Sequence, residues 1–448
     1  MLFVDVIPAP GQHFYSRSGA NHTRAFANVD FHPLLLYFTF WLSHSILQKK
    51  RLMAFEQTER WFGPNDPVTL QELKQTGATG IVTALHHTPT GEVWSSDEIL
   101  KRRQTIEAAG LRWSVAESLP IHEDIKQRAG AYRRFVENYK ASVRNLGACS
   151  VDTVCYNFMP VLDWSRTDLA VPFQDGSMTT KFELAAFAAF DLFLLKRPGA
   201  EKSYTEDQLR RAKQYFGRLS ESQKDQLVQT VLLGFPGSLE AYTMKELLAA
   251  LHAYQDIGDA GLRANLAEFI HNIIPVAEEA GVRMAIHPDD PPWSLLGLPR
   301  VVSNSQDIAH IVSIVDSRSN GITLCTGSLG ASKRNNLVDM AERFAPKIHF
   351  VHLRNVSCTG DGDFIEDNHL DGDVDMYGVV KTLLLEQKRR AAEGRADRRM
   401  PMRPDHGHLM LADRHWHDLY PGYSLFGRMR GMAELRGLEL GIQKSLGW

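Results

Sequence analysis

The sequence predicts an α/β fold, namely a TIM (β/α)8 barrel in which parallel strands alternate with helices. Short apolar runs that end at turn residues alternate with longer amphipathic runs along most of the chain. This is the pattern of buried parallel strands joined by helices. We count eight strand-like runs, which is the number that closes such a barrel. The last four of them each end on a side chain that can bind a metal ion.

The first four strands follow residue 53. We expect them at 59–64, 80–87, 111–118 and 153–158. Thr69 and Glu72 have the spacing of a capping box, which predicts that a helix begins between the first two strands. Ser95 and Glu98 repeat this spacing before the third strand. The chain therefore begins as a series of strand–helix units.

The alternation stops after the fourth strand. Between residues 163 and 262 the pattern shows helical stretches and no convincing strand. A segment of this length is too long for an ordinary loop of a barrel. We therefore predict a helical insertion on the barrel rim, which would serve as a lid or an interface. The remaining strands are expected at 282–287, 322–327, 348–354 and 401–407.

Residues 1–52 differ from the rest of the chain. The apolar run at 32–47 is short for a membrane span and is interrupted by His44. It also lacks the basic start and the cleavage site of a signal peptide. Globular patterning starts at Met53. We expect residues 1–52 to be an N-terminal extension outside the fold, translated from a start codon set too early, and residues 53–448 to be the catalytic barrel domain.

Charge and cysteine content exclude several classes of partner. The net charge of -3 and the pI of about 6.7 give no basic surface for nucleic acid or an anionic membrane. The four cysteines form no CxxC pair and no secretory framework. A reducing compartment is the simpler interpretation, so we expect a cytoplasmic protein without a nucleic-acid or membrane partner.

Four candidate metal ligands end the last four strands, namely His287, Cys325, His352 and Asp405. The carboxyl ends of the strands of a parallel barrel meet on one rim, so these side chains could converge on one ion. Two imidazoles, a thiolate and a carboxylate suit Mn, Fe, Co or Zn better than Mg or Ca. Any one of the four could be structural, but four in succession favour a metal site.

Other polar residues at strand ends are candidates for substrate contact. Arg354 and Arg403 stand beside ligand-bearing strand ends and could clamp a carboxylate, or they could be structural arginines of the barrel. His86, His87 and Asn157 also end strands, and for them substrate contact and structural hydrogen bonding are equally plausible. The loop HPDDPP is stiffened by two prolines, and its acids could orient ligands.

Several strings from residue 53 to residue 448 resemble the mannonate dehydratases of bacterial hexuronate catabolism. Among them are GIVTALHH, VCYNFMPVLDW, MAIHPDDPP, HLDGDVDMY, MRPDHGH and PGYS. The resemblance implies a xylose-isomerase-like barrel and a divalent Mn or Fe ion. It also implies a lyase that dehydrates the sugar acid D-mannonate to 2-keto-3-deoxy-D-gluconate and water. The same four strand-end residues would be the metal ligands.

The resemblance also places the acid and base of the reaction on His406 and Tyr423. Adjacent strand residues face opposite ways, so Asp405 and His406 can share a pocket only if the strand ends before them. His406 could act as acid or base near neutral pH, whereas Tyr423 would need a nearby cation to act as base. The sequence leaves open which residue has which role.

Two alternative functions fit the same pattern. A metal-dependent sugar isomerase or epimerase would use the same barrel and ion, and a non-catalytic sugar-acid binding protein would keep both without turnover. Fold alone does not decide between them. We expect a homo-oligomer, such as a dimer.

Overall fold

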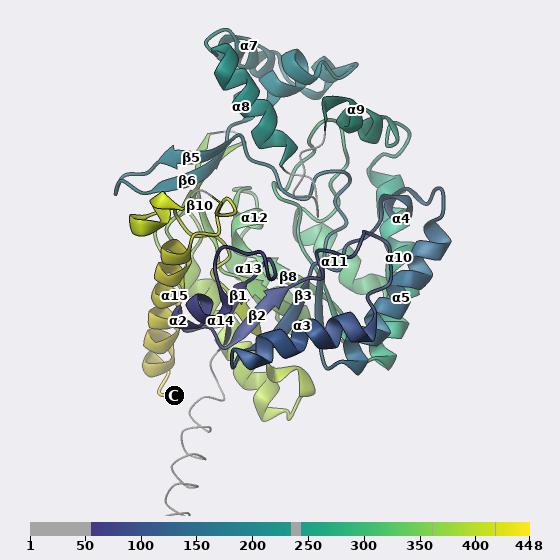
Figure 1. Cartoon of the computed structure of the whole chain (residues 1–448), viewed down its shortest axis with the longest axis vertical. Helices are drawn as coiled ribbons and strands as arrows, with labels where there is room; N and C mark the ends of the chain where they lie inside the picture. Colours follow the sequence, from purple (N-terminus) through teal and green to yellow (C-terminus); the bar gives the residue numbers. More distant parts are fainter. Residues whose placement is uncertain (1–54, 234–242, 361, 417) are drawn as a thin grey trace, which may run out of the picture. The chain divides into compact units, whose positions relative to one another are not determined.

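The computed structural model describes residues 55–233, 243–360, 362–416 and 418–448 (Figure 1). Eight parallel strands form a closed barrel in the order β1-β12-β9-β8-β7-β4-β3-β2. They are β1 (Glu56–Arg60), β2 (Gly80–Thr83), β3 (Arg112–Glu117), β4 (Thr153–Tyr156), β7 (Arg283–Ile286), β8 (Asn320–Cys325), β9 (Ile348–His352) and β12 (Pro401–Arg403). The predicted (β/α)8 barrel is therefore confirmed. The predicted N-terminal extension, residues 1–52, lies outside the described residues.

The first strand lies three residues before its predicted position. It covers Glu56–Arg60 and not 59–64, because its sequence EQTER has no apolar alternation. Thr58 and Glu59 are nonetheless buried. Glu59 lies 3.4 Å from the Arg428 guanidinium, so an ion pair compensates a charge that hydrophobic patterning cannot reveal.

Helices surround the barrel. They are α2 (Leu70–Gln75), α3 (Ser96–Ala108), α4 (Glu123–Gln127), α5 (Tyr132–Ala148), α10 (Asp259–Glu279), α11 (Ser305–Ile314), α12 (Thr326–Gly330), α13 (Leu337–Phe344), α14 (Met376–Ala392) and α15 (Leu425–Ser445). Thr69 and Glu72 form the predicted capping box. Ser95 also caps its helix, but the Glu98 carboxylate turns to His87 at 2.9 Å. None of the helices in the described ranges has the length and hydropathy of a membrane span.

The segment after β4 contains both helices and strands. The helical elements are α6 (Leu184–Ala189), the π-helix η1 (Phe190–Leu195), the 3-10 helix η2 (Ala200–Ser203), α7 (Glu206–Phe216), α8 (Glu221–Leu232) and α9 (Met244–His252). Helices α7, α8 and α9 lie together at the top of the view in Figure 1. They contribute the helical part of the insertion predicted for residues 163–262.

Two strands in this segment contradict the prediction that it holds none. Strands β5 (Asp168–Pro172) and β6 (Met178–Phe182) join β10 (Asn355–Gly360) and β11 (Asp363–Asp367) in a sheet of order β10-β11-β6-β5. β5 has no buried residue, so apolar alternation does not mark it. β6 pairs with β11, where Phe182 lies opposite Phe364, and such a long-range pairing leaves no local pattern.

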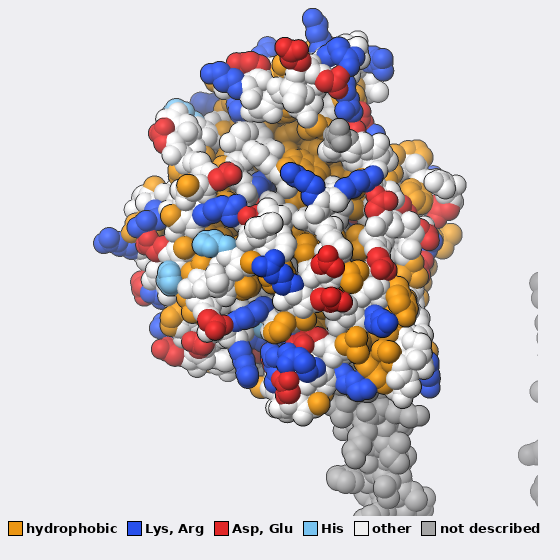
Figure 2. All heavy atoms as spheres, turned by 180° about the vertical axis from the view of Figure 1, so that it is seen from behind, with side chains coloured by type: hydrophobic (Ala, Val, Ile, Leu, Met, Phe, Trp, Pro, Cys, Tyr) orange, Lys and Arg blue, Asp and Glu red, His pale blue; other side chains and the backbone are white. Residues whose placement is uncertain are grey.

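The barrel interior is filled by small and apolar side chains from five strands, namely Val82, Val115, Cys155, Ala285 and Phe350, all fully buried. The barrel is therefore a packed core with its polar chemistry at the rim, as the fold class requires. On the face in Figure 2, basic and acidic side chains are interspersed.

The buried Glu439 on α15 makes stability depend on pH. It accepts hydrogen bonds from the backbone N–H of Phe55 and from Gln57 Nε2, and burial raises its pKa to about 7. Because the folded protein holds this proton more tightly than the unfolded chain, the contribution is complete below about pH 4.3 and is lost as pH rises through 7. The loss is about 3 kcal/mol for a shift from 4.5 to about 7.

We expect Glu439→Gln, which stays neutral at every pH, to remove this dependence. The melting temperature of the variant should match the parent near pH 4.5 and exceed it increasingly up to pH 8. Differential scanning fluorimetry at both pH values measures the difference. A melting-temperature difference that is the same at pH 4.5 and pH 8 would contradict a proton held by Glu439.

Candidate metal centre

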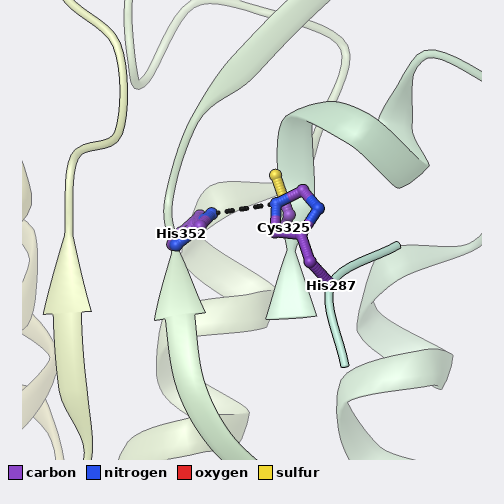
Figure 3. Close-up of side chains that lie close together, drawn as sticks. All are labelled: His287, Cys325 and His352. Carbon is purple, nitrogen blue, oxygen red and sulfur yellow. Dashed lines mark hydrogen bonds between the residues drawn. The ribbon is translucent and has the colours of Figure 1, made fainter. Parts of the chain in front are cut away.

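Three of the four predicted ligands lie on neighbouring strands of the barrel. His287 directly follows β7, Cys325 ends β8, and His352 ends β9 in register with Cys325. One donor atom from each, two imidazole nitrogens and Sγ, lies within 4.8 Å of the other two. Figure 3 shows the three side chains pointing toward one another, with a dashed line between the two imidazoles.

Asp405, the fourth predicted ligand, lies close to two of these donors. It lies two residues after β12, and its Oδ2 is 3.9 Å from both Cys325 Sγ and His352 Nδ1. The backbone of Asp405 is left-handed, with φ 71°, a conformation that aspartate tolerates better than most residues. The strand has thus ended before Asp405 and His406, which is the condition for both side chains to face one pocket.

Hydrogen bonds orient the imidazole of His287. Its Nδ1 lies 2.7 Å from the carbonyl oxygen of Pro288, which can only accept, so Nδ1 carries the proton. Nε2 then presents its lone pair 3.2 Å from His352 Nδ1. A backbone carbonyl that fixes the tautomer in this way is typical of metal-binding histidines.

Glu117 at the end of β3 is a site residue that the sequence analysis missed. Its Oε1 lies 3.4 Å from His352 Nε2 and accepts a hydrogen bond from Arg403 Nη2 at 3.0 Å. Burial opposes ionisation, but Arg403, His352 and Arg60 lower the pKa of Glu117 to about 2. His352 Nε2 also accepts a hydrogen bond from Arg403 Nε at 3.1 Å, so the neutral ring carries its proton on Nδ1, which faces His287 Nε2. An ion bound at Nδ1 would move this proton to Nε2, where the Glu117 carboxylate can accept it.

The ionisation of the donors suits a divalent cation. Burial and the Arg403 guanidinium hold the pKa of His352 well below its ordinary value, so its imidazole is neutral. Burial opposes ionisation of Asp405 as well, but Arg403 and His406 hold its pKa well below the ordinary value. Burial raises the pKa of the Cys325 thiol to about 12, and a coordinated ion would reverse that shift.

The distances between the donors also fit one ion. Ligand atoms on opposite sides of an ion with bonds of about 2.0–2.3 Å are at most about 4.6 Å apart. The His287–His352 separation of 3.2 Å and the two Asp405 separations of 3.9 Å lie inside this limit. His287, Cys325 and His352 therefore form a candidate metal site, and Asp405 lies 3.9 Å from two of its donors.

His406 and Tyr423 lie beside this site, brought together by two adjacent chain segments. The backbone N–H of Gly407 donates to the Gly422 carbonyl at 2.8 Å, and the two rings are 5.2 Å apart between centroids. Gly407 also lies against the start of α15. A Cβ at this position would be 2.3 Å from the backbone nitrogen of Arg428, so only glycine fits there. Burial raises the pKa of Tyr423, against the lowering effect of Arg403.

Arg354 and Arg403 are both buried at the rim and engaged with protein carboxylates. Arg403 forms ion pairs with Asp405 and Glu117, and Arg354 Nε lies 3.4 Å from Asp405 Oδ2. These contacts place both guanidiniums around the donor set. They support the structural role that the sequence analysis left open.

The other three candidates lie differently. His86 is exposed and its Nε2 is 3.4 Å from Arg60 Nη2. The exposed His87 contacts Glu98 on α3, and Asn157 donates to Asp163 Oδ2 at 3.3 Å. Within the described residues, these contacts of His86, His87 and Asn157 do not reach the four predicted metal ligands.

A cavity of about 180 Å³ borders His406 and Arg354 on the side of the four-stranded sheet β10-β11-β6-β5, the second sheet of the protein. Threonines of β6, Asp367 and Trp416 contribute to its lining. His406 and Arg354 therefore border a pocket with both polar and aromatic walls, as is common for small-molecule sites.

Comparisons with known proteins agree over most of the chain. A family model described as D-mannonate dehydratase (UxuA) matches residues 55–447. The mannonate dehydratase of Saccharophagus degradans is 51% identical over 383 residues, 86% of this chain and 96% of the relative. That of a Marinomonas species is 52% identical over 392 residues, 87% of this chain and 100% of the relative. The crystal structure of mannonate dehydratase from Streptococcus suis serotype 2 matches with a TM-score of 0.69 and 35% identity, over 88% of this chain and 95% of that chain.

Proposed function

The chain belongs to the D-mannonate dehydratase family, and we propose that it converts D-mannonate to 2-keto-3-deoxy-D-gluconate and water. It is accordingly a hydro-lyase of hexuronate catabolism. The observation that carries the proposal is the group of three strand-end donors, with Asp405 3.9 Å from two of them and His406 and Tyr423 beside it. A binding protein has no need of two proton-transfer groups next to a metal site.

We propose Mn or Fe as the ion, because two imidazoles, a thiolate and a carboxylate are borderline ligands. His287, Cys325, His352 and Asp405 would hold it. When bound, it would supply the positive charge that stabilises the electron-rich carboxylate end of the reacting sugar acid.

The buried charges of the rim support binding of an anion. The guanidiniums of Arg60, Arg354 and Arg403 face the carboxylates of Glu117, Asp405 and Glu366 at 3.0–3.4 Å or closer. These six charges cancel one another. A divalent ion held by one thiolate then leaves a single excess positive charge, which matches the one carboxylate of an aldonate.

The reaction needs a base for the proton at C2 and an acid for the hydroxyl that leaves from C3. Because burial raises its pKa, Tyr423 keeps its proton at neutral pH and can donate it to the leaving hydroxyl. His406 Nδ1 lies 3.4 Å from the Glu366 carboxylate. When Nδ1 carries the proton and faces this carboxylate, Nε2 has the lone pair that can take the C2 proton. We propose these roles for the two residues.

The proposed function is tested by incubating the purified protein with Mn or Fe and a panel of aldonic acids. We expect D-mannonate to yield a 2-keto-3-deoxy acid, which periodate and thiobarbiturate detect, and a chelator to abolish the product. If the protein instead forms an isomer of the sugar acid in a metal-dependent reaction, and no keto-deoxy product, the result would support an isomerase or epimerase.

We also propose that the protein works in the cytoplasm as a homo-oligomer. All four cysteines are free thiols, which suits a reducing compartment. Size-exclusion chromatography with light scattering measures the oligomeric state, and a monomer at micromolar concentration would contradict this part of the proposal.

A further inference from the structure

Four buried charged side chains form a closed ring beside the metal centre. The members are Arg166, Asp290, Arg354 and Glu366, and each is at most 5% exposed. Around the ring the contacts are Arg166 to Asp290 at 2.8 Å, Asp290 to Arg354 at 2.6 Å, Arg354 to Glu366 at 3.0 Å and Glu366 to Arg166 at 2.5 Å. Each carboxylate thus lies between two guanidiniums, and the ring has no net charge.

The carboxylates of the ring are ionised despite their burial. Burial would raise the pKa of Glu366, but Arg354 and Arg166 lower it to about 2. The same two arginines hold the pKa of Asp290 far below its ordinary value against burial. All four members are charged at neutral pH, so every contact is charge-assisted and directional.

The ring meets His406 through a single edge. Arg354 Nη1 lies 3.1 Å from His406 Nδ1, and Glu366 Oε1 lies 3.4 Å from the same nitrogen. The other edge of Arg354 faces Asp405, with Nε 3.4 Å from Oδ2. One guanidinium therefore fixes the imidazole of His406 relative to the carboxylate of Asp405.

Two members of the ring come from outside the barrel. Glu366 lies on β11, where it is held by the hydrogen bond from Thr179 Oγ1 on β6 to its carbonyl oxygen at 3.1 Å. Arg166 lies between β4 and β5, and its guanidinium also stacks over Phe364 of β11 at 4.8 Å. The ring thus links the four-stranded sheet to the side chain of His406.

We propose that Glu366 and Arg166 are positioning residues for proton transfer: they hold Arg354, and through it His406, in the orientation that the dehydration requires. This inference rests on the proposed function. It assigns the second sheet a part in the reaction, in addition to its part in the fold. A displacement of about 1 Å of a proton-transfer group can cost about 10²-fold in rate.

The first test is Glu366→Gln, which preserves the shape of the side chain and removes its charge. We expect kcat to fall about 10- to 100-fold, the range found for partners that orient site residues. The KM for D-mannonate and the affinity for Mn, measured by chelator competition, should change less than kcat, since no metal ligand is replaced.

Asp363→Asn is the matched control. Asp363 lies on the same strand and pairs with Arg211 at 3.0 Å, away from His406. We expect kcat of this variant to remain within about twofold of the parent. An equal loss in both variants would mean that the sheet acts through general stability, and it would overturn the positioning role.

A double-mutant cycle with His406→Asn separates positioning from a structural role. If Glu366 acts through His406, Glu366→Gln should have almost no further effect on residual turnover once His406 is replaced. If the kcat losses of the two single variants instead multiply in the double variant, the inference is contradicted. Arg166→Lys replaces Glu366→Gln in this cycle if the glutamine variant fails to fold, because one ammonium cannot bridge the carboxylates of Asp290 and Glu366. Its loss of kcat should likewise disappear once His406 is replaced, and multiplied losses would again contradict the inference.

The outcomes also separate this inference from the proposed function. No keto-deoxy product from the parent enzyme contradicts the proposed function itself. Normal turnover by the parent together with normal kcat in folded Glu366→Gln and Arg166→Lys contradicts only the positioning role.

Discussion

Cys325→Ser is expected to lose the metal ion during purification and, with it, almost all activity. A serine hydroxyl is a harder and far less acidic ligand than a thiol, and at this buried position it would stay protonated. We expect the affinity for Mn or Fe to fall by more than about 100-fold, beyond the range reported for residues outside the ligand set. Metal content by plasma mass spectrometry and affinity by chelator competition measure the change.

Cys358→Ser is the matched control for this substitution. Cys358 is half-buried on β10, where its thiol contacts the carbonyl oxygens of Gly330 and Ala331 at 3.6 and 3.4 Å. This variant should retain one ion per chain. Full metal occupancy in Cys325→Ser would remove Cys325 from the ligand set.

Tyr423→Phe is expected to lower kcat by about 10²- to 10⁴-fold while the metal content stays intact. This is the usual contribution of a positioned proton donor or acceptor. The aromatic ring contacts with Phe62 and His406 would remain in the variant, so the loss reports the hydroxyl. Steady-state kinetics with D-mannonate, together with a metal assay, provide the measurement.

Tyr420→Phe removes a hydroxyl from the same loop without touching His406. Its ring stacks on Phe62 at 3.9 Å between centroids, and we expect turnover within about twofold of the parent. Unchanged turnover in Tyr423→Phe would exclude Tyr423 from proton transfer.

The convergence of His287, Cys325 and His352 could be predicted because strand ends are marked in the sequence. The strand β7 ends one residue before His287, and β12 ends two residues before Asp405. The strands β8 and β9 end at Cys325 and His352 themselves. In a parallel barrel these stops share one rim, so the convergence follows from topology. The same rule would have found Glu117, which ends β3 in the same way.

The second sheet and the charged ring could not be predicted in this way. β5 pairs with its neighbour β6, and β6 pairs with β11, which lies far along the chain. β5 has no buried residue and carries no apolar alternation. The buried Arg166 and Glu366 look like ordinary surface charges in the sequence, because only their partners across the fold compensate their burial.

X-ray absorption spectroscopy at the metal edge tests the central claim most directly, namely that the four strand ends bind one divalent ion. For the loaded parent protein we predict one sulfur neighbour at about 2.3 Å together with nitrogen and oxygen neighbours at about 2.0–2.2 Å. The sulfur shell should be absent in Cys325→Ser and present in Cys358→Ser. A metal-loaded parent without a sulfur neighbour would contradict the assignment of the site.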